Sequence, residues 1–130
     1  MTAEARTRAI SSGQFITSSE IADLAAYSKR NPSAAPSRWK KERQIFSVKH
    51  KGIDYFPLFA LNPDNNYRPY KAVEEILRIF GDSLSGWGIA SWFIGLNSFL
   101  DDQSPKDLLA SDPQWTIGAA RDAVGEMSHA

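Results

Sequence analysis

Residues 90–109 read ASWFIGLNSFLDDQSPKDLL, a run of large apolar side chains that ends in an acidic pair and a proline. This density of apolar residues predicts a helix at the centre of the fold, over residues 86–100. Trp87 and Ile94 lie seven residues apart, on one face of that helix. A second, broader stripe consists of Ile89, Trp92, Phe93, Leu96 and Leu100.

The two stripes of this helix need separate cover, because burying a Trp or Phe side chain contributes about 1.5–3 kcal/mol. We expect one stripe to pack on an amphipathic helix at 70–80. The other stripe needs cover either from the last helix of the chain or from another protein chain. With cover from the last helix, the central helix would be buried wholly within its own chain.

The composition is that of an ordinary globular protein. The 130 residues suffice for one domain or for two small lobes that share a core. The hydrophobic content of 42% and the charged content of 23% are ordinary for a globular protein. There is no cysteine, only two histidines are present, and no glycine-rich phosphate loop follows a predicted strand. We therefore expect no enzyme activity and no cofactor.

The acidic pair Asp101-Asp102 is interpreted as a polar turn and not as a metal site, because hard cations need more oxygen ligands. The first residues lack the apolar core of a secretory signal. No stretch approaches the roughly 18 apolar residues of a membrane span. The expected location is the cytoplasm, with no membrane partner.

The net charge of zero hides a split between the two halves of the chain. Residues 1–60 contain ten Lys and Arg against five Asp and Glu, whereas residues 61–130 contain five against ten. The basic excess is steepest over 29–51, with eight basic residues and one acidic residue. Two surfaces with different partners are one interpretation, and two solvated faces are the other.

The N-terminal half predicts two helices after a weakly helical start. The first is TSSEIADLAAY (17–27), with Thr17 or Ser18 as its N-cap. Its apolar stripe would be Ile21, Leu24 and Ala25. Asn31-Pro32 then breaks the chain before a second, basic helix with Pro36 in its first turn.

Two strand-like runs follow, at 44–50 and 53–61, and Lys51-Gly52 joins them as a tight turn. Pro57 predicts an edge strand or an irregular one, because proline has no backbone N–H to donate to a ladder. Helix, basic helix and hairpin in this order are typical of a winged helix-turn-helix.

The loop at 62–69 is the best candidate boundary between two lobes, at 1–61 and 62–130. We expect three further helices beside the central one: at 70–80, after Ser104-Pro105, and at 113–126. The predicted fold class is α+β and mainly helical. A small winged helix-turn-helix-like lobe with a β-hairpin is followed by a C-terminal helical bundle.

The opening stretch resembles the C-terminal toxin-binding domain of Xre/MbcA/ParS-type antitoxins. The spacing that carries the resemblance is that of Trp92-Phe93, Asn97, Leu100, Pro105 and Leu108-Leu109. Two positions depart from the family pattern. Phe93 replaces the usual leucine, and Asp102 stands where glycine is common, which changes the expected turn geometry. The resemblance covers roughly residues 70–130.

The resemblance implies an antitoxin of a type II toxin–antitoxin module, which binds and neutralises a cognate toxin. Such toxins are often of the RES type, which depletes NAD. The motif residues that would shape the domain are Trp92, Asn97, Leu100, Pro105, Leu108 and Leu109. Candidate toxin contacts lie in the last helix and tail, at Ala119, Ala120, Arg121, Ala123, Glu126 and Met127. The alternative for this tail is simple fraying.

The basic lobe predicts contacts to operator DNA, since the second helix of such a motif enters the major groove and the wing meets phosphates. Candidate DNA-binding residues are Arg38, Lys40, Lys41, Arg43, Lys49 and Lys51. An antitoxin of this kind would also repress its own operon. The alternative function is a stand-alone winged-helix regulator that homodimerises through its helical lobe. In both cases we expect a homo-oligomer.

Overall fold

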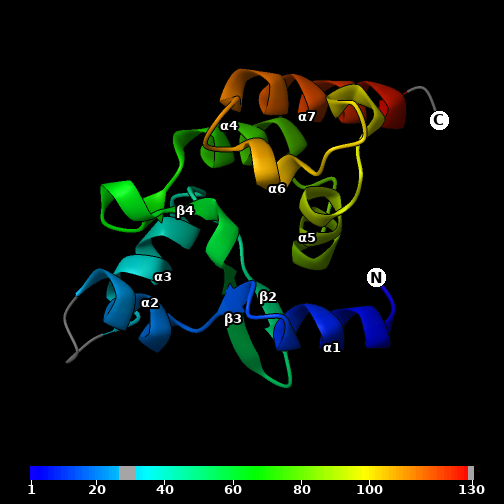
Figure 1. Ribbon diagram of the computed structural model, residues 1–130. Coiled ribbons are helices and arrows are strands. Elements are labelled where there is room, and N and C mark those ends of the chain that lie inside the picture. Colours follow the sequence, from blue (N-terminus) through cyan, green and yellow to red (C-terminus); the bar gives the residue numbers. More distant parts are fainter. Residues whose placement is uncertain (27–31, 129–130) are drawn as a thin grey trace.

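The computed structural model describes residues 1–26 and 32–128, and it is mainly helical with a small antiparallel sheet, as predicted (Figure 1). The elements of the N-terminal half are α1 (Ala3–Ser11), β1 (Phe15–Ile16), α2 (Ser18–Ala25), α3 (Ala34–Lys41), β2 (Val48–His50) and β3 (Ile53–Pro57). The predicted break at Asn31-Pro32 begins at a residue outside the described ones.

The second half adds two short strands and four helices, with three 3-10 turns along the way. In chain order these are η1 (Leu58–Ala60), β4 (Leu61–Asn62), η2 (Pro63–Asn65), β5 (Arg68–Pro69), α4 (Lys71–Phe80), α5 (Gly86–Ile94), η3 (Ser98–Leu100), α6 (Pro105–Leu108) and α7 (Pro113–Ser128). β4 and β5 pair with each other, so the predicted loop at 62–69 is a small hairpin.

β1, β3 and β2 form a three-stranded antiparallel sheet in that order. The turn between β2 and β3 is as predicted, since Lys51 and Gly52 both have positive φ, at 51° and 79°. Of the two alternatives for Pro57, the edge strand is wrong, because β3 is the central strand, and the irregular strand is confirmed, because the run at 53–61 is interrupted by η1. Pro57 is the last residue of β3 and pairs there with Phe15, where the chain leaves the sheet for η1.

α2 begins with a capping box, in which the Thr17 side chain accepts from the Glu20 backbone and the Glu20 carboxylate accepts from the Thr17 backbone. This confirms Thr17 as the N-cap. The predicted stripe was partly wrong, because Leu24 is exposed and Ala22 is buried in its place. The weakly helical start is a regular nine-residue helix, α1.

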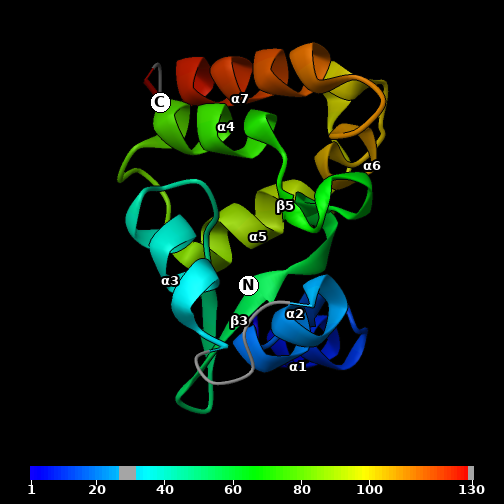
Figure 2. The ribbon, with the colours of Figure 1, turned by 90° about the vertical axis from the view of Figure 1, so that its left-hand side faces the viewer.

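α4 and α7 lie side by side and α5 crosses beneath them (Figure 2). The predicted stripe of α4 is confirmed: Val73, Ile76, Leu77 and Phe80 are all buried. On its exposed side, the Arg78 guanidinium donates to Glu74 and Glu75, at 3.4 Å and 2.6 Å.

The central helix is shorter than predicted. α5 ends at Ile94, because Gly95 takes an extended conformation and the Asn97 side chain caps a new 3-10 turn. Leu100 therefore reaches the core from η3, and Leu96 is 79% exposed instead of lying on the apolar stripe. The rest of α5 is covered within the chain, where Trp87, Ile89 and Phe93 are buried.

The main hydrophobic core contains residues from both halves of the chain. Phe93 of α5 stacks on Phe46 at 5.7 Å between ring centroids and contacts Phe59 at 5.4 Å. The two expected lobes therefore share one core, and the division at residue 61 stays a prediction. Along residues 1–26 and 32–128, the longest apolar helices fall short of what a bilayer crossing requires.

Candidate functional site

The turn that follows α5 is held by Asn97. Its side chain accepts from the Phe99 N–H at 3.0 Å, and its backbone carbonyl accepts from Leu100 and Asp102. Asn97 also bridges to Gln103, so the segment closes on itself as a compact loop. A small polar residue at this place therefore fixes the geometry of the whole turn.

Asp101 and Asp102 both have positive φ, at 54° and 63°. This left-handed conformation favours glycine, which the resemblance places at the position of Asp102. Asp102 thus adopts a conformation that glycine takes at lower cost, and a difference in turn geometry from the family stays a prediction. Among the described residues, no group of three or more His, Asp or Glu side chains is placed to hold a metal ion.

Most motif residues serve the core. Leu100 and Leu108 pack with Ala119 of α7 in a second, smaller cluster, Leu109 belongs to the main core, and Pro105 is buried. The Ser104 hydroxyl donates to the Ile94 carbonyl at 2.8 Å and so fastens the end of α5 to the start of α6.

The turn at residues 95–103, which follows α5, is called the motif turn below. Trp92 is half-buried between α4 and this turn. Its ring meets Phe80 and Phe93 edge-on, at 5.1 Å and 5.0 Å between centroids. The indole N–H is buried and has no hydrogen-bond partner. Trp92 therefore contributes apolar packing, and its buried, unpaired N–H lowers the stability of the fold.

The same turn exposes two apolar side chains. Leu96 is 79% exposed and Phe99 is 42% exposed. Phe99 lies over Gly118 of α7, where an added Cβ would come within 3.3 Å of the ring. The apolar pattern of the sequence does not reveal this pair, because Leu96 falls on the predicted helix stripe and Phe99 lies outside it. The signal was present in Gly95 and Asn97, which end the helix.

The predicted contacts on α7 divide into two groups. Ala119 and Ala120 are 1% and 0% exposed and pack in the core, so a partner cannot reach these two positions and they are withdrawn as contacts. Arg121, Glu126 and Met127 are exposed, and Ala123 is half-buried. α7 is regular through Ser128, so the alternative of simple fraying does not apply before that residue.

Five of the six candidate DNA-binding residues share one part of the molecule. Arg38, Lys40, Lys41, Lys49 and Lys51 are exposed on α3 and on the β2–β3 hairpin. α3 is anchored from below by Pro36 and Trp39, which are buried. Lys40 of α3 and Lys49 of β2 both pair with Asp54 of β3, at 3.7 Å and 3.8 Å. We refer to these five cations and Asp54 as the basic face.

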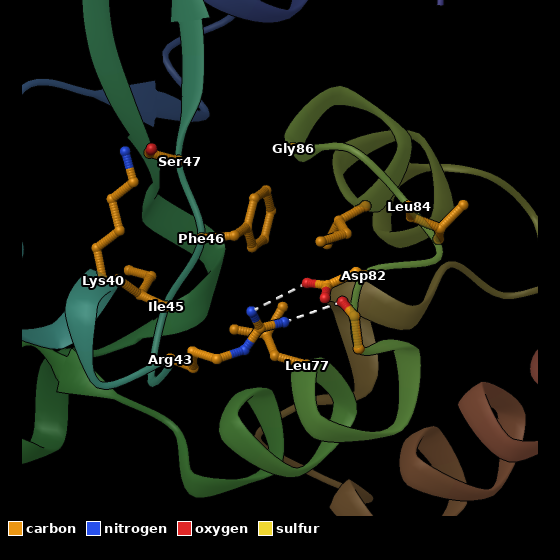
Figure 3. Close-up of a pocket in the computed structure, with 11 residues that line it drawn as sticks. Lys40, Arg43, Ile45, Phe46, Ser47, Leu77, Asp82, Leu84 and Gly86 are labelled. Atoms are coloured by element: carbon orange, nitrogen blue, oxygen red, sulfur yellow. Dashed lines mark hydrogen bonds and ion pairs between the residues drawn. The ribbon is translucent and has the colours of Figure 1, made fainter.

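Arg43 lies apart from the basic face and joins the two halves of the chain (Figure 3). Its guanidinium donates to the Gly81 carbonyl at the end of α4, at 2.9 Å, and pairs with Asp82 at 3.5 Å. It thereby satisfies a carbonyl that the helix leaves open. The side chain lines a pocket of about 230 Å³ between the halves and remains 54% exposed, so its assignment to DNA stays a prediction.

α5 also supports the hairpin directly. The Trp87 indole donates to the Lys49 carbonyl at 3.0 Å, and the Arg6 guanidinium of α1 lies 5.3 Å from the centre of the Trp87 ring. Trp87 thus links α1, α5 and β2.

Burial raises the pKa of the Tyr70 phenol, and the nearby Asp64 raises it further. The phenol therefore stays neutral through the physiological range.

No protein family, curated protein or solved structure matches this chain.

Proposed function

We propose that this chain is the antitoxin of a type II module and that it binds a protein toxin through its helical half. The observation that carries the proposal is the exposure of Leu96 and Phe99 on a turn whose other motif residues are buried or hydrogen-bonded. An ordered turn that displays apolar side chains suits a contact with another protein. The resemblance of the same residues to a toxin-binding domain adds the nature of that partner.

The charge around the turn supports a basic partner. The turn and the helices that follow it carry exposed carboxylates at Asp101, Asp102, Asp107, Asp112 and Asp122. Complementary charge favours a surface with an apolar pocket and a basic rim. A toxin active site that accommodates the phosphates of a dinucleotide has such a rim, which fits the RES type.

The test is Leu96→Asp in the full chain, assayed for neutralisation of the toxin in a growth assay. Because the side chain is exposed, the variant should fold as the natural chain does and lose at least tenfold in affinity for the toxin. The matched control is Leu24→Asp, which places the same charge on the exposed side of α2. If both variants neutralise the toxin equally well, the toxin does not contact this turn and the proposed contact is wrong.

A second function, binding to operator DNA, is favoured by the order of the N-terminal elements. Helix, strand, two helices and a hairpin, with the sheet order β1-β3-β2, is the order of a winged helix-turn-helix. α3 would enter the major groove and the hairpin would meet phosphates. An antitoxin that binds operator DNA represses its own operon. A stand-alone regulator would bind operator DNA without binding a toxin.

The DNA function is tested with Arg38→Ala/Lys41→Ala against Arg68→Ala/Lys71→Ala. Both double variants remove two exposed cations, and only the first pair lies on the basic face. The first should weaken operator binding and lower the slope of log K against log salt by about two. The second should leave both unchanged. An equal effect of the two pairs would refute the groove assignment.

A further inference from the structure

The basic face contains one carboxylate at its centre. Asp54 is directly opposite Lys49 in the β2–β3 ladder, and its Oδ1 lies 3.8 Å from the Lys49 ammonium. Its other oxygen, Oδ2, lies 3.7 Å from the ammonium of Lys40 on α3. Each oxygen therefore faces a cation from a different element, and both of these cations are candidate phosphate contacts.

The position of Asp54 is set by the fold. β3 is the central strand, and Phe56, two residues further along, lies on the same face of the sheet as Asp54 and is buried. Asp54 itself stays 40% exposed, and Lys49 is 69% exposed. Glu42, the acidic residue nearest in sequence on the N-terminal side, instead accepts from the Gln44 amide at 2.9 Å. The carboxylate of Asp54 is thus in contact with solvent and with two of the five cations.

We infer that Asp54 is a specificity-determining residue of the DNA-binding face, and that its carboxylate occupies the place of a backbone phosphate on Lys40 and Lys49. The inference rests on the DNA function proposed above. A phosphate that approaches either lysine must displace or share this carboxylate, which repels it. The Asp54 carboxylate therefore lowers the affinity for DNA of any sequence, which depends on phosphate contacts. Base contacts from Arg38 then contribute a larger share of the affinity for an operator.

The exposed pairs with Lys40 and Lys49 contribute little to stability, so Asp54 can be replaced without unfolding the chain. This makes Asp54→Asn a suitable variant, because the amide keeps the size of the side chain and removes its charge. The matched control is Asp107→Asn in α6. Asp107 is also exposed and also paired with a lysine, Lys106, at 2.8 Å.

The experiment measures binding of the full chain to a 20-base-pair duplex of random sequence by fluorescence anisotropy, from 50 to 200 mM KCl. Asp54→Asn should allow the lysines to make one further ionic contact with a DNA phosphate. We expect the slope of log K against log salt to steepen by about 0.9 and the affinity at 100 mM to rise about eightfold. Asp107→Asn should match the natural chain in both quantities.

The effect must pass through the two lysines. In a double-mutant cycle, Asp54→Asn should have no effect once Lys40 and Lys49 are both replaced by alanine. If the natural chain binds DNA and Asp54→Asn changes neither slope nor affinity, the inference is overturned and the DNA function stands. If neither chain binds duplex at any salt concentration, the DNA function fails and the inference fails with it. Binding by Asp54→Asn alone would support the inference.

Discussion

Single backbone positions govern how closely the two halves of this chain approach each other. Gly86 begins α5, and a Cβ at this position would collide with the backbone carbonyl oxygen of Ser47, just before β2. Arg43 crosses the same junction to the end of α4. Glycine at 86 is therefore required by packing between the halves, and its own φ would tolerate any residue.

Gly86→Ala should lower the free energy of unfolding by about 2 kcal/mol, since a backbone carbonyl cannot move aside as a flexible side chain does. Urea unfolding measures the change. The control is Gly125→Ala in α7, where nothing lies within 4 Å of the added Cβ. That variant should gain about 1 kcal/mol from helix propensity. Equal effects of the two substitutions would contradict the close contact between α5 and Ser47.

Asp102→Gly should raise the free energy of unfolding by about 0.5–1 kcal/mol, because it relieves a left-handed conformation at an exposed position. Thermal unfolding followed by circular dichroism measures the gain. Asp122→Gly, the same substitution within α7, should instead cost about 0.5 kcal/mol. A loss of stability in Asp102→Gly would mean that the carboxylate, and not the backbone, maintains this turn.

At the scale of elements, α4 was predictable because Val73, Ile76, Leu77 and Phe80 follow the helical period without interruption. The end of α5 was not, because Trp87 to Leu100 also fits that period and only Gly95 and Asn97 oppose it. The local hydrogen bonds of Asn97 prevail over the apolar pattern. That competition decides which side chains of the motif turn face outwards.

Links between distant elements were invisible in the sequence. Arg43 and Gly81 are 38 residues apart, as are Lys49 and Trp87. Nothing in the basic run 29–51 distinguishes Arg43 from Lys41, so charge alone assigned both to DNA. Burial of Ala119 and Ala120 likewise depends on how α7 packs, which small side chains do not reveal.

Trp87→Phe should destabilise the hairpin, because the Lys49 carbonyl loses its indole donor at 3.0 Å. We expect a loss of about 1–2 kcal/mol in the free energy of unfolding, together with faster hydrogen exchange at β2. Arg6→Ala keeps this hydrogen bond and removes only the contact with the ring, so it should cost no more than about 1 kcal/mol. Unchanged exchange at β2 in Trp87→Phe would show that α5 does not support the hairpin.

At the scale of the whole molecule, the charge split of the sequence becomes a spatial one. The basic face lies on α3 and the hairpin, whereas the motif turn and α7 carry exposed carboxylates. Figure 1 places these regions towards opposite ends of the molecule. One core joins the halves, so a partner on either surface meets a single folded unit. Under the two proposed functions, the toxin and the DNA would therefore occupy separate surfaces.

The central claim is that this chain neutralises a toxin through the motif turn. The most direct measurement is growth of cells that produce the product of each neighbouring gene, alone and together with the full tagged chain, followed by purification of the complex. We predict that one neighbour arrests growth, that the chain restores growth and co-purifies with it, and that Leu96→Asp does neither. A homo-oligomer that co-purifies with no neighbour, beside neighbours that are all harmless, would contradict the claim and favour the stand-alone DNA-binding regulator.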